Sequence, residues 1–514
     1  MAPLDSGAFK FTQDGVIYSC NKSNKRASVQ GPENIGIKKV DIPERILSDG
    51  DFYTVTSIAS NAFQGCTSLT SVKMGSGIET IGTSAFSGTS VKTVTLSRNL
   101  KIIGKEAFCG ADIENLSLPE NLEIIRESAF RANTKLKTVT FGYKLTEIGN
   151  YAFSGCINLT GVSMPSSVTI LGIDAFDDCK ALTSLHLSSS LTLIPEGAFS
   201  NCPITNLSIP ASVTTIGNSA FFNNRTASIT IPGNVRTIGE WAFENSSVQS
   251  LTISEGVTTI GANAFEECTQ LKSVILPKSA VNVGHSTFAR CHSLASVTLA
   301  PTLKALPEKM FYECGSLQSL NIPEGVESIG YWTFRSCSKL ASVDFPASLR
   351  TIGEEAFSAC TSLKSVNFKE GLQRICEEAF GSTDITTLTL PASLAQLDAG
   401  AFRGLWLTKI ITLGKVPAAC GAEAFTSYAY DYAPLYVPEG TADIYRSAAE
   451  WKNFKDIRTQ ENASIDGITA DDNILTEYHD LTGHKVTDLH PGTMYIRTTI
   501  YSDGHRETTK IIAR

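Results

Sequence analysis

Cysteine is the residue type in this sequence with the widest scope for chemistry, and the chain contains 13 of them. Nine stand three residues after a recurring phenylalanine, so they would form a column if each unit folds alike: Cys66, Cys156, Cys179, Cys202, Cys268, Cys291, Cys314, Cys337 and Cys360. Such a column could bind a string of metal ions, form a ladder of disulfides, or pack as small buried side chains. We favour buried packing, because the chain has no Cys-x-x-Cys pair and no Cys/His cluster. Other units place polar residues in the same column: Thr89, Asn133, Asn224 and Ser246.

The remaining candidates for chemistry are weaker. His285 and His292 flank Phe288 and could form a zinc pair, but without a further ligand motif we interpret them as exposed polar residues. Asp471-Asp472-Asn473 could bind Ca²⁺, yet the segment lacks the full EF-hand spacing and fits a solvated linker turn better. The sequence also lacks a Walker A motif and an H-E-x-x-H motif. We therefore predict no catalytic, cofactor-binding or metal-binding residues; an enzyme with an unrecognised site is the least favoured alternative.

Internal repetition supplies the elements that position these residues. A phenylalanine recurs in steps of 22 or 23 residues, which defines 17 units over residues 58–425: Phe63, Phe86, Phe108, Phe130, Phe153, Phe176, Phe199, Phe221, Phe243, Phe265, Phe288, Phe311, Phe334, Phe357, Phe380, Phe402 and Phe425. Such a period is typical of solenoids, in which each unit packs only against its neighbours.

One unit shows the local pattern. Leu340, Val343 and Phe345 have the spacing L-x-x-L-x-L of a leucine-rich-repeat strand, and Pro346 ends that strand. Residues 352–360 then return the chain through a short helical or turn segment. The sequence predicts an α/β fold, namely a right-handed solenoid with one long parallel β-sheet on one face and short helical turns on the other.

A glycine four residues before the repeated phenylalanine is common, as at Gly82, Gly261 and Gly353. Pro195 and Pro307 occupy the same position in two other units. Because proline requires a φ near −65° and donates no N–H, we expect this glycine to provide space rather than a positive φ.

Both ends of the array depart from the repeat. Residues 1–57 are predicted to be an N-terminal cap with a hairpin at Asp14-Gly15, because terminal units must cover the exposed core. Residues 426–460 are predicted to be a C-terminal cap, with a last strand at 435–438 and a short helix over 441–451 whose N-cap is Thr441. Residues 461–514 are predicted to form a small all-β module.

The outward positions of the predicted strands carry mainly small hydroxyl residues, such as Thr95, Ser117 and Thr140. Binding hot spots favour Trp, Tyr and Arg instead. The large candidates lie in the returning segments, and they form either an aromatic platform for protein or sugar or a set of packing contacts between coils: Tyr151, Trp241, Tyr312, Tyr331 and Trp332.

Composition limits the classes of partner. The net charge is −8 and there is no long Lys/Arg run, so we expect no nucleic acid partner. No apolar run reaches about 18 residues, so we expect no membrane insertion. Residues 1–7 lack the basic start and apolar stretch of a signal peptide, and we expect that any export signal is absent from this sequence.

Over residues 40–460 the chain resembles the BspA-like, or Treponema pallidum type, leucine-rich repeat proteins, because Ile-Gly-x-x-Ala-Phe-x-x-Cys recurs in register. The segment 435–454 is similar to the closing cap of such proteins in Bacteroides, and 478–486 is similar to the sorting tails of exported Bacteroidetes proteins. The resemblance implies export, an extracellular location at the cell surface, and adhesion to a host or bacterial protein or glycan, without a cofactor. A structural spacer remains the alternative. We expect a monomer or weak self-association.

Overall fold

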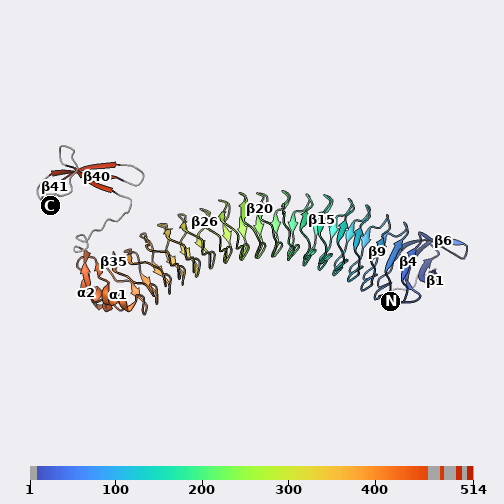
Figure 1. Ribbon diagram of the computed structural model, residues 1–514, viewed down its shortest axis with the longest axis horizontal. Coiled ribbons are helices and arrows are strands. Elements are labelled where there is room, and N and C mark those ends of the chain that lie inside the picture. The colour runs from blue at the N-terminus through green and yellow to red at the C-terminus, as the bar shows by residue number, and fades with distance from the viewer. Residues whose placement is uncertain (1–7, 461–474, 480–493, 501–505, 513–514) are drawn as a thin grey trace.

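The computed structural model describes residues 8–460 in full, and residues 475–479, 494–500 and 506–512 as backbone. The repeat units stack as successive coils of one arched solenoid, with the N-terminal strands at one end and α1 and α2 at the other (Figure 1). Leucine-rich-repeat stacking was predicted correctly. The right-handed sense of the coiling stays a prediction.

Each typical coil contributes a longer and a shorter strand, so the solenoid has two parallel faces where we predicted one sheet. The long-strand face comprises β7 (Ser71–Met74), β9 (Thr93–Thr95), β11 (Asn115–Ser117), β13 (Thr138–Thr140), β15 (Gly161–Ser163), β17 (Ser184–His186), β20 (Ser228–Ile231), β22 (Ser250–Ile253), β24 (Ser273–Ile275), β26 (Ser296–Thr298), β28 (Ser319–Asn321), β30 (Ser342–Asp344), β33 (Thr387–Leu390) and β35 (Lys409–Thr412). The short-strand face comprises β8 (Thr80–Ile81), β10 (Ile102–Ile103), β12 (Ile124–Ile125), β14 (Glu147–Ile148), β16 (Ile170–Leu171), β18 (Leu193–Ile194), β19 (Thr215–Ile216), β21 (Thr237–Ile238), β23 (Thr259–Ile260), β25 (Asn282–Val283), β27 (Ala305–Leu306), β29 (Ser328–Ile329), β31 (Thr351–Ile352), β32 (Arg374–Ile375), β34 (Gln396–Leu397) and β36 (Ala419–Cys420).

The short-strand face is divided into three sheets, and both divisions coincide with a proline. Hydrogen bonding stops between β16 and β18, where Pro195 follows β18, and again between β25 and β27, where Pro307 follows β27. In other coils a glycine at this position donates its N–H to the preceding coil, as Gly284 does to the Ile260 carbonyl at 2.8 Å. Proline has no N–H to donate, so this bond is lost.

The returning segments contain turns rather than the predicted helices; within residues 58–425 no helix is formed. Alternate N–H groups bond to the next coil, as Phe63 N does to Ala85 O at 2.7 Å, and those between them bond within the turn, as Gln64 N does to Asn61 O at 3.2 Å. In every unit the residue two before the repeated phenylalanine has a positive φ. The α/β description is therefore wrong, because inter-coil hydrogen bonds consume the donors that an α-helix would need.

Stacked phenylalanines form the core of the turn side. From Phe63 to Phe425 each ring lies nearly parallel to the next, with centroids between 5.0 and 5.9 Å apart. Such contacts add about 0.5–1.5 kcal/mol each beyond burial of area. All these rings are buried. The constant phenylalanine thus has a packing role.

The cysteine column lies beside this ladder. All 13 cysteines are free thiols, and the nine of the column are buried, as the packing interpretation predicted. From Cys156 onward each thiol of the column also donates to the phenylalanine carbonyl of the preceding coil, for example Cys360 Sγ to Phe334 O at 3.1 Å. Asn133 Nδ2 donates to the equivalent Phe108 oxygen at 2.7 Å, which explains why polar residues share the column. Burial raises the pKa of the Cys360 thiol to about 12 and so suppresses the reactive thiolate.

The recurrent glycine serves close approach, as predicted. Gly82, Gly261 and Gly353 have no positive φ, and a Cβ at each would come within 3.0 Å of backbone in the preceding coil. At Gly239 the Cβ would lie 2.6 Å from Asn218 N. The column therefore sets how closely coils can stack.

The N-terminal cap is built from strands. β1 (Ala8–Gln13) and β2 (Val16–Asn21) form the predicted hairpin, with φ of 52° at Asp14 and 73° at Gly15. β3 (Arg26–Pro32), β5 (Arg45–Ser48) and β6 (Asp51–Ile58) extend this sheet toward β8, while β4 (Lys39–Ile42) pairs with β7.

The C-terminal cap contains the only helices of the described residues: α1 (Ser427–Tyr432), α2 (Ala442–Ser447) and the 3₁₀ turn η1 (Trp451–Asn453). Strands β37 (Leu435–Val437) and β38 (Ile457–Thr459) continue the long-strand face from β35. The helix predicted over 441–451 is thus interrupted. Thr441 precedes α2 but its side chain makes no cap bond; its hydroxyl donates to Pro438 O at 2.7 Å.

Strands β39 (Leu475–His479), β40 (Met494–Ile500) and β41 (Arg506–Ile512) pair antiparallel. Their connections are outside the described residues, so a small all-β module over 461–514 stays a prediction. Asp471-Asp472-Asn473 also lies outside the described residues.

Candidate functional site

The five predicted site residues lie around the turn segments. Tyr151, Trp241 and Trp332 stand two positions before their phenylalanine, with φ of 57°, 54° and 56°. Tyr331 precedes Trp332, and Tyr312 follows Phe311. A bulky residue at positive φ is uncommon and costs about 1–2 kcal/mol. Every unit has a positive φ at this position, so the conformation belongs to the repeat and does not by itself mark these three residues as a site.

The structure brings three of the five residues together. The Trp332 ring centroid is 5.7 Å from that of Tyr312 and 6.0 Å from that of Tyr331. Trp241 and Tyr151 lie on other coils, and neither contacts another aromatic ring within residues 8–460. Trp241 is 40% exposed, Tyr331 is 36% exposed, and Trp332 is partly buried. The predicted platform is therefore one cluster plus two separate rings.

Cations cover the faces of the clustered rings. Lys309 Nζ lies 5.2 Å from the ring centroids of both Tyr331 and Trp332, and Arg335 Cζ lies 4.5 Å from that of Trp332. We call Lys309, Tyr312, Tyr331, Trp332 and Arg335 the aromatic–cation cluster. Each contact contributes about 0.5–1 kcal/mol at an exposed site. Lys309 and Arg335 were not among the predicted site residues, because spacing along the chain does not specify that their side chains lie over these rings.

Two polar groups of the cluster, an ammonium and an indole N–H, have no hydrogen-bond or salt-bridge partner in the described residues. Lys309 forms no salt bridge within residues 8–460, whereas Arg335 pairs with Glu355. Trp332 Nε1 is buried without a hydrogen-bond partner. An unsatisfied buried donor is costly and calls for an explanation.

An acidic strip is formed by Glu244, Glu266, Glu267 and Glu313, and its last member directly follows Tyr312 of the cluster. Arg290 crosses it, with nitrogen–oxygen distances of 3.4 Å to Glu266, 3.2 Å to Glu267 and 3.4 Å to Glu313. Burial, and then the charge of Glu266, raises the pKa of Glu244 to about 7. Negative charge therefore borders the cations of the cluster.

The long-strand face offers little beyond hydroxyl groups. Its side chains bond to one another from coil to coil, as in Thr138 Oγ1 to Asn115 Oδ1 at 2.8 Å and Thr93 Oγ1 to Ser71 Oγ at 3.1 Å. These bonds align the side chains into rows. The face is mainly polar, as the sequence predicted, with Ile275 as an exposed apolar exception.

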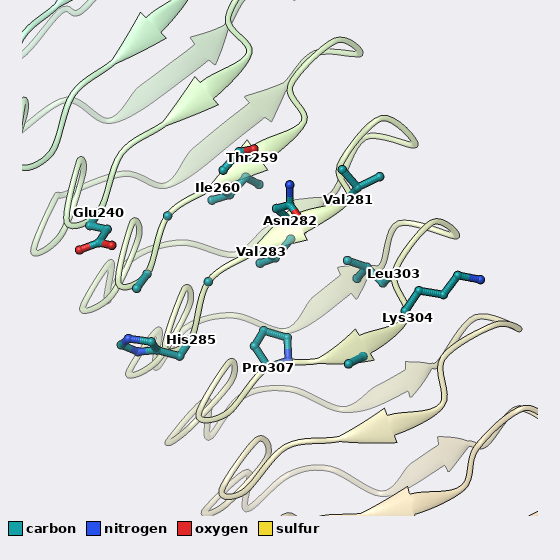
Figure 2. Close-up of a pocket in the computed structure, with 14 residues that line it drawn as sticks. Glu240, Thr259, Ile260, Val281, Asn282, Val283, His285, Leu303, Lys304 and Pro307 are labelled. Carbon is teal, nitrogen blue, oxygen red and sulfur yellow. The ribbon is translucent and has the colours of Figure 1, made fainter.

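A hollow of 550 Å³ opens on the short-strand face at the break between β25 and β27. Figure 2 shows Ile260, Asn282 and Val283 along its floor, with Glu240 and His285 toward one end and Lys304 at the other. The polar groups are thus spread over successive coils and do not converge on one point. His285 Nδ1 lies 3.3 Å from Ser286 Oγ, and His292 is exposed.

A second aromatic group lies at the C-terminal cap, and the sequence analysis did not select it. The Trp406 ring centroid is 4.8 Å from that of Tyr428, which is 5.0 Å from that of Tyr432. We call these three residues the cap triad. The sequence feature that could have indicated this group is the departure from the repeat at 427–432, where Tyr428 and Tyr432 stand four residues apart, as on one face of a helix.

Two kinds of feature are absent from the described residues. No group of three or more His, Cys, Asp or Glu side chains is arranged to hold a metal ion. None of the described helices has the length and apolarity needed to cross a membrane.

Comparisons with known proteins address the repeat array. The family model "BspA type Leucine rich repeat region" matches in six overlapping copies, at residues 34–160, 101–227, 146–272, 215–341, 281–409 and 332–458. No curated protein matches the sequence. No catalytic family is indicated by these matches.

Several solved structures are similar. A leucine-rich repeat protein from Bacteroides ovatus ATCC 8483 is 29% identical, with 75% of this chain and 96% of that chain covered and a TM-score of 0.52. A leucine rich cell surface protein from Faecalibacterium prausnitzii A2-165 is 24% identical, covering 69% and 93%, with a TM-score of 0.41. The T. pallidum leucine rich repeat protein is 17% identical, covering 70% and 92%, with a TM-score of 0.17.

Proposed function

Because the chain belongs to the BspA type leucine rich repeat family, we propose that it is an exported cell-surface protein that binds a host or bacterial macromolecule. The aromatic–cation cluster is the proposed contact. Its residue types carry the proposal, since Trp, Tyr and Arg dominate binding hot spots in protein interfaces. The partner we favour is therefore an extracellular protein, with a glycan as the second possibility.

The charges of the cluster refine the partner. The Lys309 ammonium group has no acidic partner within residues 8–460, so an incoming carboxylate could pair with it. Trp332 Nε1 could donate to an acceptor on the partner if the side chain moves outward on binding. The bordering acidic strip would repel partners that are acidic over a wide area. These features favour a protein with a small acidic patch.

The test is a binding screen of the purified monomer against fibronectin, fibrinogen and mucin at physiological salt. Trp332→Ala and Lys309→Ala should each weaken a saturable interaction about tenfold, which corresponds to about 1.4 kcal/mol. Trp241→Ala is the matched control, because Trp241 has the same backbone conformation and no aromatic neighbour in the described residues. Binding that survives both cluster substitutions would contradict the assignment.

Self-association as a surface spacer is the alternative function. Exposed apolar side chains on neighbouring coils favour it: Ile170 is 55% exposed, Leu193 is 47% exposed and Ile173 is 39% exposed. Light scattering would detect a dimer, and Ile170→Ser should weaken it. A monomer at high concentration would argue against this role.

A further inference from the structure

The cap triad contains the two most exposed aromatic side chains of residues 8–460. Trp406 is 69% exposed and Tyr432 is 71% exposed, whereas Tyr428 lies partly buried between them. Exposed apolar side chains that gather in one place mark interaction sites more often than isolated ones do. The triad therefore differs from a chance surface aromatic.

Local structure holds these rings in place. Helix α1 buries Ala429 and packs Tyr430 against Phe454 with centroids 4.9 Å apart, which leaves Tyr428 and Tyr432 on its other face. The Thr426 side chain accepts a hydrogen bond from Ala429 N at 3.2 Å and fixes the start of the helix. Because α1 fixes the backbone of both tyrosines before a ligand arrives, binding has only their side chains to order.

The ring faces of the triad are open. Within residues 8–460 no Lys or Arg covers them, in contrast to the rings of Tyr331 and Trp332. The cations nearby are engaged in salt bridges, with Lys455 Nζ 2.9 Å from Asp431 and Arg403 2.7 Å from Glu378. The surface thus offers flat aromatic faces without an unpaired cation to select an acidic ligand.

Polar groups adjoin the open rings. Asp431 stands three residues after Tyr428 in α1, so the two share one helix face, and its carboxylate pairs with Lys455 Nζ at 2.9 Å. A sugar ring has one face of C–H groups, which are attracted to the negative face of an aromatic ring, and a rim of hydroxyls that need hydrogen-bond partners. Open rings beside the Asp431–Lys455 pair match both halves of this chemistry.

We propose that Trp406, Tyr428 and Tyr432 form a binding site for a neutral polysaccharide. Successive sugar residues stack on the three rings, and their hydroxyls bond to Asp431 and Lys455. The site is separate from the aromatic–cation cluster and binds independently of it. Its location at the cap leaves the repeat surface free for another partner.

Affinity electrophoresis of the full chain tests the proposal. The gels contain soluble neutral polysaccharides in turn, namely a β-glucan, a mannan, a galactomannan and a dextran, and tryptophan fluorescence measures the affinity of any hit. We expect retardation by at least one of them, and a loss of about tenfold in affinity for Trp406→Ala, equivalent to about 1.4 kcal/mol. Tyr432→Ala should weaken binding, and Tyr432→Phe should retain the stacking.

Tyr143→Ala is the matched control, since Tyr143 is 61% exposed and belongs to a different coil. It should leave retardation unchanged, as should Trp332→Ala. Circular dichroism verifies that each variant is folded. The proposal is overturned if no neutral polysaccharide retards the chain, or if retardation survives both Trp406→Ala and Tyr432→Ala. It is also overturned if the triad variants abolish only binding to a protein, and that result would leave the proposed function intact.

Discussion

The turn side of the solenoid and its two strand faces differ in continuity. On the turn side the phenylalanine stack runs unbroken from Phe63 to Phe425. The short-strand face is divided at Pro195 and Pro307, and the long-strand face consists of several separate sheets. The strands carry the L-x-x-L-x-L signature, yet the turns carry the uninterrupted contacts.

This difference indicates which part of each coil is free to vary. Contacts between neighbouring coils determine the stability of a solenoid, and the turn side maintains them in every coil. Positions on the outer rim of the turns then accept residues as different as Asn263 and Trp332 at the same backbone conformation. Both the acidic strip and the aromatic–cation cluster occupy this rim.

The largest difference in stability between the turn side and the strand faces should appear when one ring of the phenylalanine stack is removed. Phe243→Ala should lower the free energy of unfolding by about 3–5 kcal/mol, because the ring is fully buried between Phe221 and Phe265. Thr252→Ala, at an exposed position of β22, should change it by less than about 0.5 kcal/mol. Chemical denaturation followed by circular dichroism measures both. Equal effects would show that the strand face matters as much as the stack.

A second test compares two kinds of glycine. Gly239→Ala should cost about 3 kcal/mol, since the new Cβ would lie 2.6 Å from the Gly217 carbonyl carbon. Gly88 has a φ of 65° and nothing within 4 Å of its Cβ position, so Gly88→Ala should cost only about 1 kcal/mol. Ala132 already occupies the equivalent position in another unit. The same denaturation experiment separates them, and a larger loss for Gly88→Ala would refute close approach as the role of the glycine column.

The fold was predictable where one physical requirement repeats. The phenylalanine period gave the number of coils, and the tolerance of Pro195 in the glycine column excluded a positive φ there. The returning segment was predicted wrongly as helical because alternate N–H groups bond to the next coil, and the sequence of a single unit cannot reveal that. A second strand of two residues, such as β14, is also too short to show alternation.

The candidate site was predictable only in residue type. Tyr312, Tyr331 and Trp332 could be selected as large residues in the turns, but their separation from Trp241 depends on the stacking of coils. The cations of Lys309 and Arg335 over the rings depend on side-chain direction, which spacing does not specify. The cap triad was missed because Trp406 and Tyr428 meet across two units with different conformations.

We expect pH to have a smaller effect on the free energy of unfolding, through Glu244 on the turn side. The folded-state pKa of Glu244 is about 7 against an ordinary value of 4.5, so the folded chain binds the extra proton between these values. The free energy of unfolding should therefore fall as pH rises from 4.5 to 7 and then level off. Glu266 and Glu267 oppose ionisation of Glu244, and Arg290 favours it.

Glu244→Gln removes this titration. The variant should be more stable than the parent at pH 8 and about equal to it at pH 5, as measured by thermal unfolding. Solvent screening around the half-buried carboxyl keeps the effect below that of Phe243→Ala. Glu120→Gln, at an exposed position, is the control. An unchanged difference between the two pH values would contradict the role of Glu244.

The smallest change in the free energy of unfolding should come from restoring the missing hydrogen bond between β25 and β27 on the short-strand face. Pro307→Gly restores an N–H that could donate to the Val283 carbonyl, as Gly284 N does to Ile260 O. The gain of a hydrogen bond, about 0.5–1.5 kcal/mol, nearly offsets the loss of about 0.4–1 kcal/mol from greater freedom of the unfolded chain. The free energy of unfolding should thus change by less than about 1 kcal/mol.

Hydrogen exchange should nevertheless slow in residues 303–307, and the hollow beside Asn282 should narrow. If exchange there stays as fast as in the parent, the proline is not the cause of the break, and the missing pairing of β25 with β27 must come from the side chains between them.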